Sequence, residues 1–293
     1  MRIHPILLFL FVLSAIAPVM AGNPDRSVLR PDGVAENLGY TPGDTLMIIP
    51  AYVKEVPDYC FAGCPALRRV EFEPGSRCRS IGEYAFAECS RLEEISLPSG
   101  IAAIGEGAFR ECRSLQRLSL PDGMREVERE LCLRCVALSE VSFPQHLAKI
   151  GAMAFAGCDS LESVRFPSSL TVIGNNAFSG CRSIEEVVLP AALRQLESYA
   201  FEGCRSLRRL VLPAAGNELG ELIVADCPKL TEIEARSEVP PAFECGSSLF
   251  EPDDTAASRR CTLIVPQGAE AAYRMAPGWK LLSKIRSAGI DIL

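Results

Sequence analysis

Thirteen cysteines are the most conspicuous chemically active side chains of this 293-residue chain. Residues that recur at a fixed spacing occupy one equivalent site in successive repeats, so their side chains point the same way, whereas a disulfide requires two Cβ atoms that converge. A buried free cysteine packs as a small apolar residue. We therefore expect a reduced, buried cysteine column at the positions that recur after 25 and then every 23 residues: Cys64, Cys89, Cys112, Cys135, Cys158, Cys181, Cys204 and Cys227.

The remaining cysteines offer other chemistry. Cys132 and Cys135 form a C-x-x-C pair, which is typical of a redox site or of half a zinc site. Cys135 belongs to the cysteine column, however, and no second pair or nearby histidine completes a metal site. We therefore interpret this pair as structural. Cys245 and Cys261 flank a loop near the C-terminus, and we suspect a disulfide there, since closing such a loop would add about 3 kcal/mol to stability.

Catalytic motifs are scarce. The chain has only two histidines, and His146 stands in an expected loop with no nucleophile beside it. The sequence has no phosphate-binding glycine loop and no H-E-x-x-H metal motif, and the acidic run Glu251–Asp254 is typical of a turn. We predict that the protein is not an enzyme and that it has no metal and no cofactor. A net charge of −7 and a pI near 5.1 argue against a nucleic-acid partner.

The cysteine spacing belongs to a longer repeat. Each unit carries an Ile-Gly pair, then Ala-Phe, then the cysteine, then Leu-x-x-Ile-x-Leu-Pro, as in residues 81–98. Alternation around Ile95 and Leu97 predicts a short strand with one face buried, and Pro98 ends it because proline has no N–H to donate. One unit cannot bury its apolar side chains alone, but stacked units share a core. The sequence predicts a solenoid of about eight coils, with one strand per coil lining one long face.

The outward positions of these strands form the candidate functional surface. Their charges alternate in sign from coil to coil, which fits either a charge ladder that keeps the sheet soluble and in register or a recognition surface. The acidic residues Glu162, Glu185 and Glu186 would suit a basic peptide. The candidate binding residues are Glu94, Ser96, Arg117, Ser119, Glu140, Ser142, Glu162, Arg165, Glu186, Val188, Arg209 and Val211.

The two ends of the chain differ from the repeats. A positively charged start and the apolar run Ile6–Ala17 predict a secretory signal peptide, and no later stretch is long enough to span a membrane. A solenoid must cover its core at both ends, so we expect capping segments, with Trp279 packed in the second. The expected division is a signal peptide at 1–21, an N-terminal cap at 22–55, repeats at 56–235 and a C-terminal cap at 236–293.

The unit Ile-Gly-x-x-Ala-Phe-x-x-Cys-x-x-Leu-x-x-Ile-x-Leu-Pro resembles the BspA-like leucine-rich repeats of bacterial secreted and cell-surface proteins. The segments Cys261–Pro266 and Gly278–Trp279 are similar to the family's usual closing segment. The resemblance implies a right-handed leucine-rich repeat solenoid, with a parallel β-sheet on the concave face and short helical or irregular turns on the convex face. It also implies a role in adhesion or recognition.

These inferences together predict a secreted or cell-surface protein, with the periplasm as an alternative location. We expect it to bind a protein, such as a host matrix protein or another surface protein, or a glycan through the concave strand face. One alternative is a structural or scaffold component of the bacterial cell envelope. A carbohydrate-active enzyme is the least favoured alternative, because it would need paired carboxylates in a defined cleft.

Overall fold

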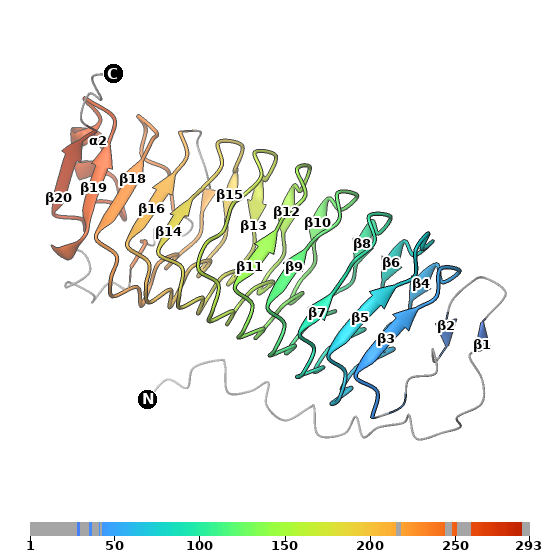
Figure 1. The fold of residues 1–293 in the computed structure, drawn as a ribbon. Coiled ribbons are helices and arrows are strands. Elements are labelled where there is room, and N and C mark those ends of the chain that lie inside the picture. The colour runs from blue at the N-terminus through green and yellow to red at the C-terminus, as the bar shows by residue number, and fades with distance from the viewer. Residues whose placement is uncertain are drawn as a thin grey trace, which may run out of the picture.

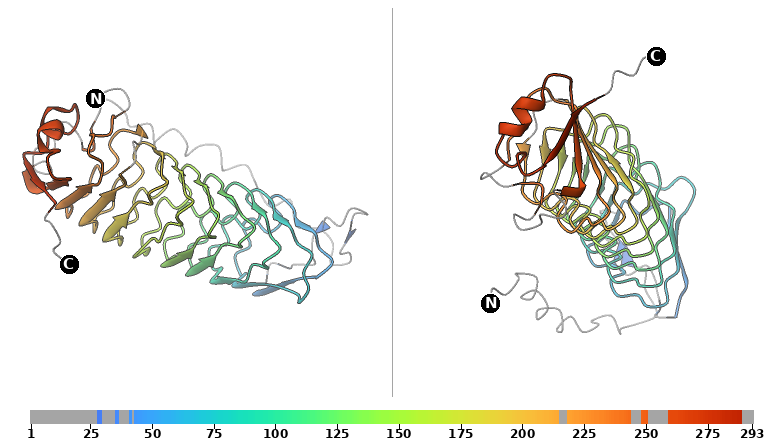
Figure 2. Two further views of the ribbon diagram at one scale, coloured as in Figure 1. Left: turned by 90° about the horizontal axis from the view of Figure 1, so that it is seen from above. Right: turned by 90° about the vertical axis from the view of Figure 1, so that its left-hand side faces the viewer.

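The computed structural model describes residues 28–29, 35–36, 41, 43–214, 218–243, 248–250 and 259–288. The chain winds into a stack of coils that runs from one end of the molecule to the other (Figure 1). Seen from the C-terminal end, the coils lie behind one another (Figure 2). The stack is a β-solenoid of about ten turns with a repeat of about 23 residues, which confirms the predicted fold.

The first wall of the stack is built from parallel strands at the Leu-x-x-Ile-x-Leu part of the repeat. Side chains alternate between the two faces of a strand, as in the exposed, buried and exposed residues of Arg117–Ser119. We call the outward side of this wall the strand face. Its strands are β3 (Leu46–Ile49), β5 (Arg69–Phe72), β7 (Glu94–Ile95), β9 (Arg117–Ser119), β11 (Glu140–Ser142), β14 (Glu186–Val188), β16 (Arg209–Leu212), β18 (Glu232–Ala235), β19 (Thr262–Val265) and β20 (Lys284–Ser287).

These strands reach into both expected caps. β3 pairs in parallel with β5, so Leu46 lies opposite Arg69, and β19 and β20 continue the pairing beyond β18. The stack is therefore longer than the eight coils that the repeat predicts. The strands of this wall form three separate groups, which are β3–β5–β7, β9–β11 and β14–β16–β18–β19–β20.

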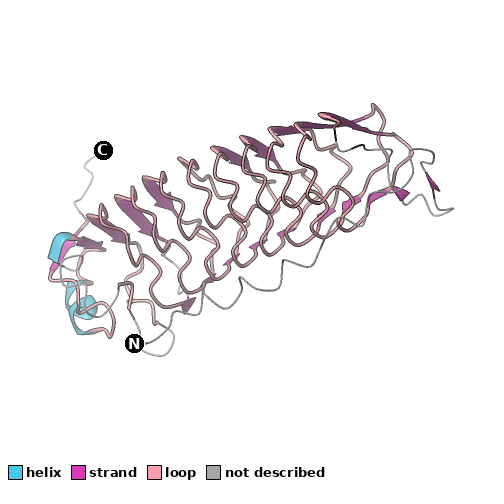
Figure 3. Cartoon of the chain, turned by 90° about the horizontal axis from the view of Figure 1, so that it is seen from below, coloured by secondary structure: helices cyan, strands magenta, loops and turns pink. Residues whose placement is uncertain are grey.

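A second parallel sheet, which the repeat does not predict, runs along another edge of the stack (Figure 3). The isoleucine of each Ile-Gly pair is the buried residue of a two-residue strand. Each coil therefore contributes two strands rather than the one expected. The strands of this row, which we call the second sheet, are β4 (Glu55–Val56), β6 (Ser80–Ile81), β8 (Ala103–Ile104), β10 (Glu126–Val127), β12 (Lys149–Ile150), β13 (Val172–Ile173), β15 (Gln195–Leu196) and β17 (Glu218–Leu219). They form two hydrogen-bonded groups, β4–β6–β8 and β10–β12–β13–β15–β17.

The Ala-Phe segments form a third wall, made of turns, and between residues 43 and 214 the chain contains no helix. Successive coils are joined here by backbone hydrogen bonds, such as Tyr84 N to Glu106 O and Phe86 N to Ala108 O, both 2.8 Å. The turns place Tyr84 at a φ of 52°, in the left-handed region. The rings of Phe86 and Phe109 stack with centroids 5.8 Å apart. Hydrogen bonds and ring stacking thus tie this wall together along the stack.

The C-terminal end of the stack is closed by the short helix α2 (Glu270–Met275) and the segment that follows it (Figure 2). Trp279 is fully buried, and its Nε1 donates a hydrogen bond to the carbonyl oxygen of Pro241 at 2.8 Å. The buried Tyr273 ring meets Trp279 edge to face, with centroids 5.2 Å apart. The predicted packing of the only tryptophan in this end of the molecule is confirmed.

The N-terminal end is described more sparsely. The short strands β1 (Val28–Leu29) and β2 (Ala35–Glu36) pair antiparallel. The predicted signal peptide at residues 1–21 lies outside the described residues, and the expected division into caps and repeats stays a prediction. Within the described part of the chain, no helix combines the length and the apolar composition needed to cross a membrane.

Candidate recognition surface

Ten of the twelve predicted binding residues are exposed. Neighbouring strands keep them in register, so Arg117 lies opposite Glu140 and Ser119 lies opposite Ser142. Because neighbouring strands lie about 4.8 Å apart, each column presents a row of closely spaced side chains. The exposed residues are Glu94, Ser96, Arg117, Ser119, Glu140, Ser142, Glu162, Arg165, Glu186 and Val188.

Val211 is the clear exception, because the column pattern predicts it to be exposed and the structure buries it completely. Its neighbours in register are Val188 and Glu234. Arg209 stands two residues before Val211 on the same face and pairs diagonally with Glu234, so this ion pair covers the valine. The expectation of a binding contact at Val211 is therefore wrong, whereas Val188 remains 43% exposed.

The two ends of the strand face carry the charge ladder that the alternating signs suggest. Near the N-terminal end, Nε of Arg69 lies 3.3 Å from Oε2 of Glu94. Near the C-terminal end, the half-buried Arg209 bridges two strands, because it pairs with Glu186 and, through Nε to Oε1 at 2.8 Å, with Glu232. The hydrogen bond to Glu186 raises the pKa of Arg209. These ion pairs join neighbouring coils, as expected for a charge ladder that holds the strands in register.

The middle coils carry charges that the ladder does not neutralise. Arg117 and Glu140 lie opposite one another, yet no ion pair joins them. Within the described part of the chain, no ion pair involves Glu162, Arg165 or Glu185 either. All five side chains are exposed. A role in holding strands in register therefore does not account for the charges of the middle coils.

The strand-face sheet is interrupted in the coil between β11 and β14. Residues Glu162–Phe166 occupy the strand position of that coil but form no strand, and within the described residues their backbone makes no hydrogen bond to either neighbouring coil. The same coil is held normally by the second sheet, where β13 pairs with both β12 and β15. The interruption is thus confined to the strand face.

Two phenylalanines pack against each other beside the interruption. Phe143 and Phe166 stand where the repeat has leucine, and their rings stack with centroids 6.3 Å apart. This separation is wider than the usual strand spacing of about 4.8 Å. Each ring also meets a turn-wall ring nearly at right angles, Phe155 and Phe178 respectively, with centroids 5.6 Å apart. The stacked rings lie where a ladder would otherwise join the two coils.

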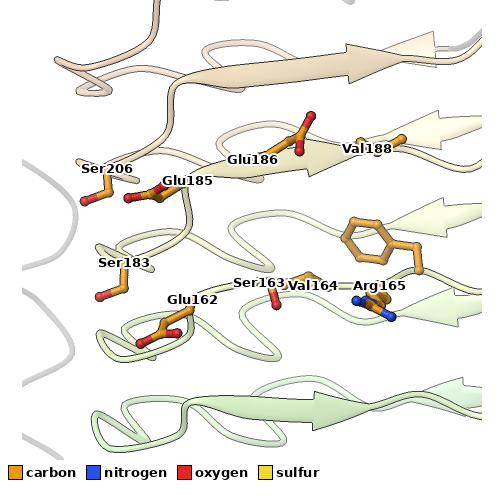
Figure 4. Close-up of a pocket in the computed structure, with 10 residues that line it drawn as sticks. Glu162, Ser163, Val164, Arg165, Ser183, Glu185, Glu186, Val188 and Ser206 are labelled. Atoms are coloured by element: carbon orange, nitrogen blue, oxygen red, sulfur yellow. The ribbon is translucent and has the colours of Figure 1, made fainter.

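A hollow of about 970 Å³ opens over the interruption, and we call it the central hollow. Figure 4 shows the carboxylates of Glu162 and Glu185 at one end of it and Arg165 and Val188 at the other. Sequence reasoning missed the hollow and its serines, although two successive phenylalanines at a leucine position signal a local change. Smaller hollows of about 230, 380 and 510 Å³ open elsewhere on the strand face.

The cysteine column is buried, as predicted. Thiols in it donate hydrogen bonds to carbonyl oxygens of the preceding coil, such as Cys112 Sγ to Phe86 O at 3.1 Å. From Cys89 to Cys227 the column forms no disulfide. Cys132 is fully buried too, and burial raises the pKa of its thiol. The structural interpretation of the C-x-x-C pair fits this setting, because redox chemistry and zinc binding use the thiolate, which burial disfavours.

The other candidates for chemistry add no site among the described residues. Cys261 is buried, and burial raises its pKa to about 12. Its suspected disulfide partner Cys245 lies outside the described residues, so that pairing stays a prediction, and the acidic run Glu251–Asp254 lies outside them as well. His146 is exposed. No group of three or more metal-ligating side chains occurs in the part of the chain that the structure describes.

Comparison with known proteins identifies the family of the repeats. Six copies of the BspA type leucine rich repeat region match residues 45–150 and 125–251. A leucine-rich repeat protein from Bacteroides ovatus is similar in structure, with 22% identity, a TM-score of 0.60, and coverage of 83% of this chain and 74% of that chain. A leucine rich cell surface protein from Faecalibacterium prausnitzii has 19% identity and a TM-score of 0.37 over 84% of this chain and 79% of that one. No curated protein matches.

The matched region covers well over half of the chain, so the protein belongs to the BspA-type leucine-rich repeat family. The Bacteroides ovatus protein supports the same fold. The family and the solenoid therefore agree with the prediction from the repeat unit. The strand face, whose middle coils carry charges without ion pairs among the described residues, is the candidate surface for a function.

Proposed function

We propose that this protein is a secreted or cell-surface recognition protein that binds a protein or glycan partner through the strand face and performs no catalysis. The observation that carries the proposal is the distribution of ion pairs. Near the two ends of the strand face, Arg69 and Arg209 are paired with carboxylates of neighbouring strands, whereas in the middle the exposed Arg117, Glu140, Glu162, Arg165 and Glu185 form no ion pair within the described residues. On a purely structural face, ion pairs between these charges would stabilise the register of neighbouring strands. On a recognition face, the unpaired charges are available to bind a partner of complementary charge.

The hollows support the same surface. A flat sheet surface has little concave area for a ligand to contact, whereas ligand sites are concave and carry a few well-placed polar groups. The central hollow of about 970 Å³ and three smaller ones open on the strand face. The cell-surface description of the Faecalibacterium prausnitzii protein belongs to that protein, and secretion here is inferred from the apolar N-terminal run.

A binding screen tests the proposal. The protein without residues 1–21 is applied to arrays of extracellular matrix proteins, peptides and glycans, and each hit is measured again with Arg117→Glu and with Lys149→Glu. Both substitutions replace one exposed cation with a carboxylate, but Lys149 lies on the second sheet beside Glu126. We expect Arg117→Glu to lower the affinity for a true partner at least tenfold, and Lys149→Glu to change that affinity less than twofold. An array without hits, or hits indifferent to Arg117→Glu, would contradict the proposal.

A further inference from the structure

The central hollow combines a cavity with unpaired backbone. Two strands flank the interruption, and each is paired on its far side only: β11 with β9, and β14 with β16. The edges of β11 and β14 that face Glu162–Phe166 therefore carry peptide groups outside the ladder, as does that segment itself. A chain in extended conformation has donors and acceptors at the spacing that such edges satisfy. The backbone of the hollow thus favours an extended peptide as its ligand.

The side chains of the hollow divide it into an acidic end and a cationic end. Glu162 and Glu185 occupy one end near serine hydroxyls, and Arg165 occupies the other beside the exposed Val188 (Figure 4). Glu186 lies between the two ends, and its carboxylate is ion-paired with Arg209. Three residues of extended chain separate Glu162 from Arg165, which corresponds to about 10 Å. Within the described residues, Glu162, Glu185 and Arg165 form no ion pair. A ligand can therefore contact all three charges without breaking an existing ion pair.

We propose that the central hollow binds an extended peptide segment that places a lysine or arginine at Glu162 and Glu185, an apolar side chain on Val188 and a carboxylate at Arg165. This inference rests on the proposed recognition function and deepens it by naming the ligand class. Because side chains alternate between the two faces of an extended chain, a peptide that presents both charges to the hollow carries its basic and acidic residues two or four positions apart, which corresponds to about 7–13 Å.

The hollow is less suited to a glycan. Sugar rings are commonly held by aromatic side chains that expose a ring face. Phe166 is the aromatic residue that lines the central hollow, and its ring already stacks on Phe143 and meets Phe178 edge to face. The lining supplies charges and peptide groups instead, which a peptide can match directly.

The test is a selection from a displayed library of random nine-residue peptides, followed by synthesis of the enriched sequences and measurement of Kd by fluorescence anisotropy. We expect enriched peptides to contain Lys or Arg and an acidic residue within four positions. The variant Glu162→Gln/Glu185→Gln should raise Kd at least tenfold. The matched control Glu126→Gln/Glu218→Gln removes the same charge from exposed positions on the second sheet, and should change Kd less than twofold. Affinity should also fall as salt is raised from 50 to 300 mM, because exposed charges are screened.

A second variant tests the role of the backbone. Phe143→Leu/Phe166→Leu restores the residue of the repeat at both positions, so the coils should close up, the ladder should form and peptide affinity should fall at least tenfold while the circular dichroism spectrum is retained. A library that yields no binder, or binders whose Kd is the same in Glu162→Gln/Glu185→Gln, would overturn the inference. If array partners depend on Arg117 but not on Glu162 and Glu185, the recognition function stands and the peptide site falls.

Discussion

Gly151 shows at the residue scale how closely neighbouring coils approach. A Cβ at this position would lie 2.8 Å from the backbone nitrogen of Arg129 and 2.9 Å from the carbonyl oxygen of Val127. Both contacts are to backbone of the preceding coil, which cannot move aside without disturbing the second sheet. The glycine of the Ile-Gly pair therefore serves close packing, rather than the tight turn that glycine often provides.

Gly151→Ala is expected to destabilise the protein by about 1–3 kcal/mol, which is the usual cost of overpacking a close contact. Thermal unfolding followed by circular dichroism measures the change. Gly43→Ala is the matched control, because nothing lies within 4 Å of the Cβ that it would add, and it should change stability by less than about 0.5 kcal/mol. An unchanged melting temperature for Gly151→Ala would show that the coils are not in contact there.

The buried thiols predict how stability depends on pH. Burial raises the pKa of Cys181 above its ordinary value of 9.0 and that of Cys227 to about 12. Well below pH 9 these thiols are protonated in both the folded and the unfolded states, so they add no pH dependence there. Above pH 9 the unfolded chain loses protons that the folded chain keeps, and the free energy of unfolding falls as pH rises.

Urea unfolding between pH 8 and pH 10.5 tests this dependence. We expect the decline in unfolding free energy to be less steep in Cys181→Ala than in the unsubstituted protein, by up to about 1.4 kcal/mol per pH unit for the one proton removed. Comparison with the unsubstituted protein cancels the contribution of lysines and tyrosines. Equal slopes in the two proteins would mean that the Cys181 thiol ionises as readily in the folded state as in the unfolded chain.

At the scale of elements, the interruption at Glu162–Phe166 makes a local prediction. The amides of Val164 and Arg165 lack ladder hydrogen bonds, whereas the equivalent residues two coils on, Leu210 and Val211, lie inside β16 and pair with both neighbouring strands. Hydrogen exchange should therefore be at least tenfold faster at Val164 and Arg165. In Phe143→Leu/Phe166→Leu the difference should shrink. Equal protection in the unsubstituted protein would mean that the ladder is continuous.

Sequence reasoning identified the elements whose signal repeats and missed those whose signal is short or three-dimensional. The 23-residue spacing and the alternation around Ile95 were enough to predict the stack and its first wall. The second sheet was missed because a two-residue strand such as Ser80–Ile81 is too short to show periodicity. The hollow was missed because Val164 and Phe166 keep the strand pattern, and the break shows only in the absence, among the described residues, of backbone hydrogen bonds between this segment and its neighbouring coils.

The same limit applies to the candidate site. The outward positions follow from alternation, so most of the predicted residues are exposed. Which charges pair does not follow from columns, since Arg209 reaches across a diagonal to Glu234 and buries Val211 beneath the pair. The unpaired state of Arg117 and Glu140 is likewise a property of side-chain geometry.

For the whole molecule, a stack of coils should lose stability from an end whose cap is removed, because each coil contacts only its neighbours. Trp279→Ala removes the largest fully buried side chain of the C-terminal end and should cost about 3–5 kcal/mol. Limited proteolysis should cut the C-terminal coils first and leave residues 81–150 protected. Leu281→Ala, at a position 39% exposed, is the control and should behave nearly as the unsubstituted protein. Uniform cleavage along the chain in Trp279→Ala would contradict the capping role.

The most direct test of the recognition surface is a hydrogen–deuterium exchange footprint of the protein with a partner from the binding screen. The account predicts slower exchange on the strand face of the middle coils, at Arg117–Ser119, Glu140–Ser142 and Glu162–Phe166, with Lys149–Ile150 on the second sheet unchanged. Protection confined to the second sheet or the turn wall would contradict it.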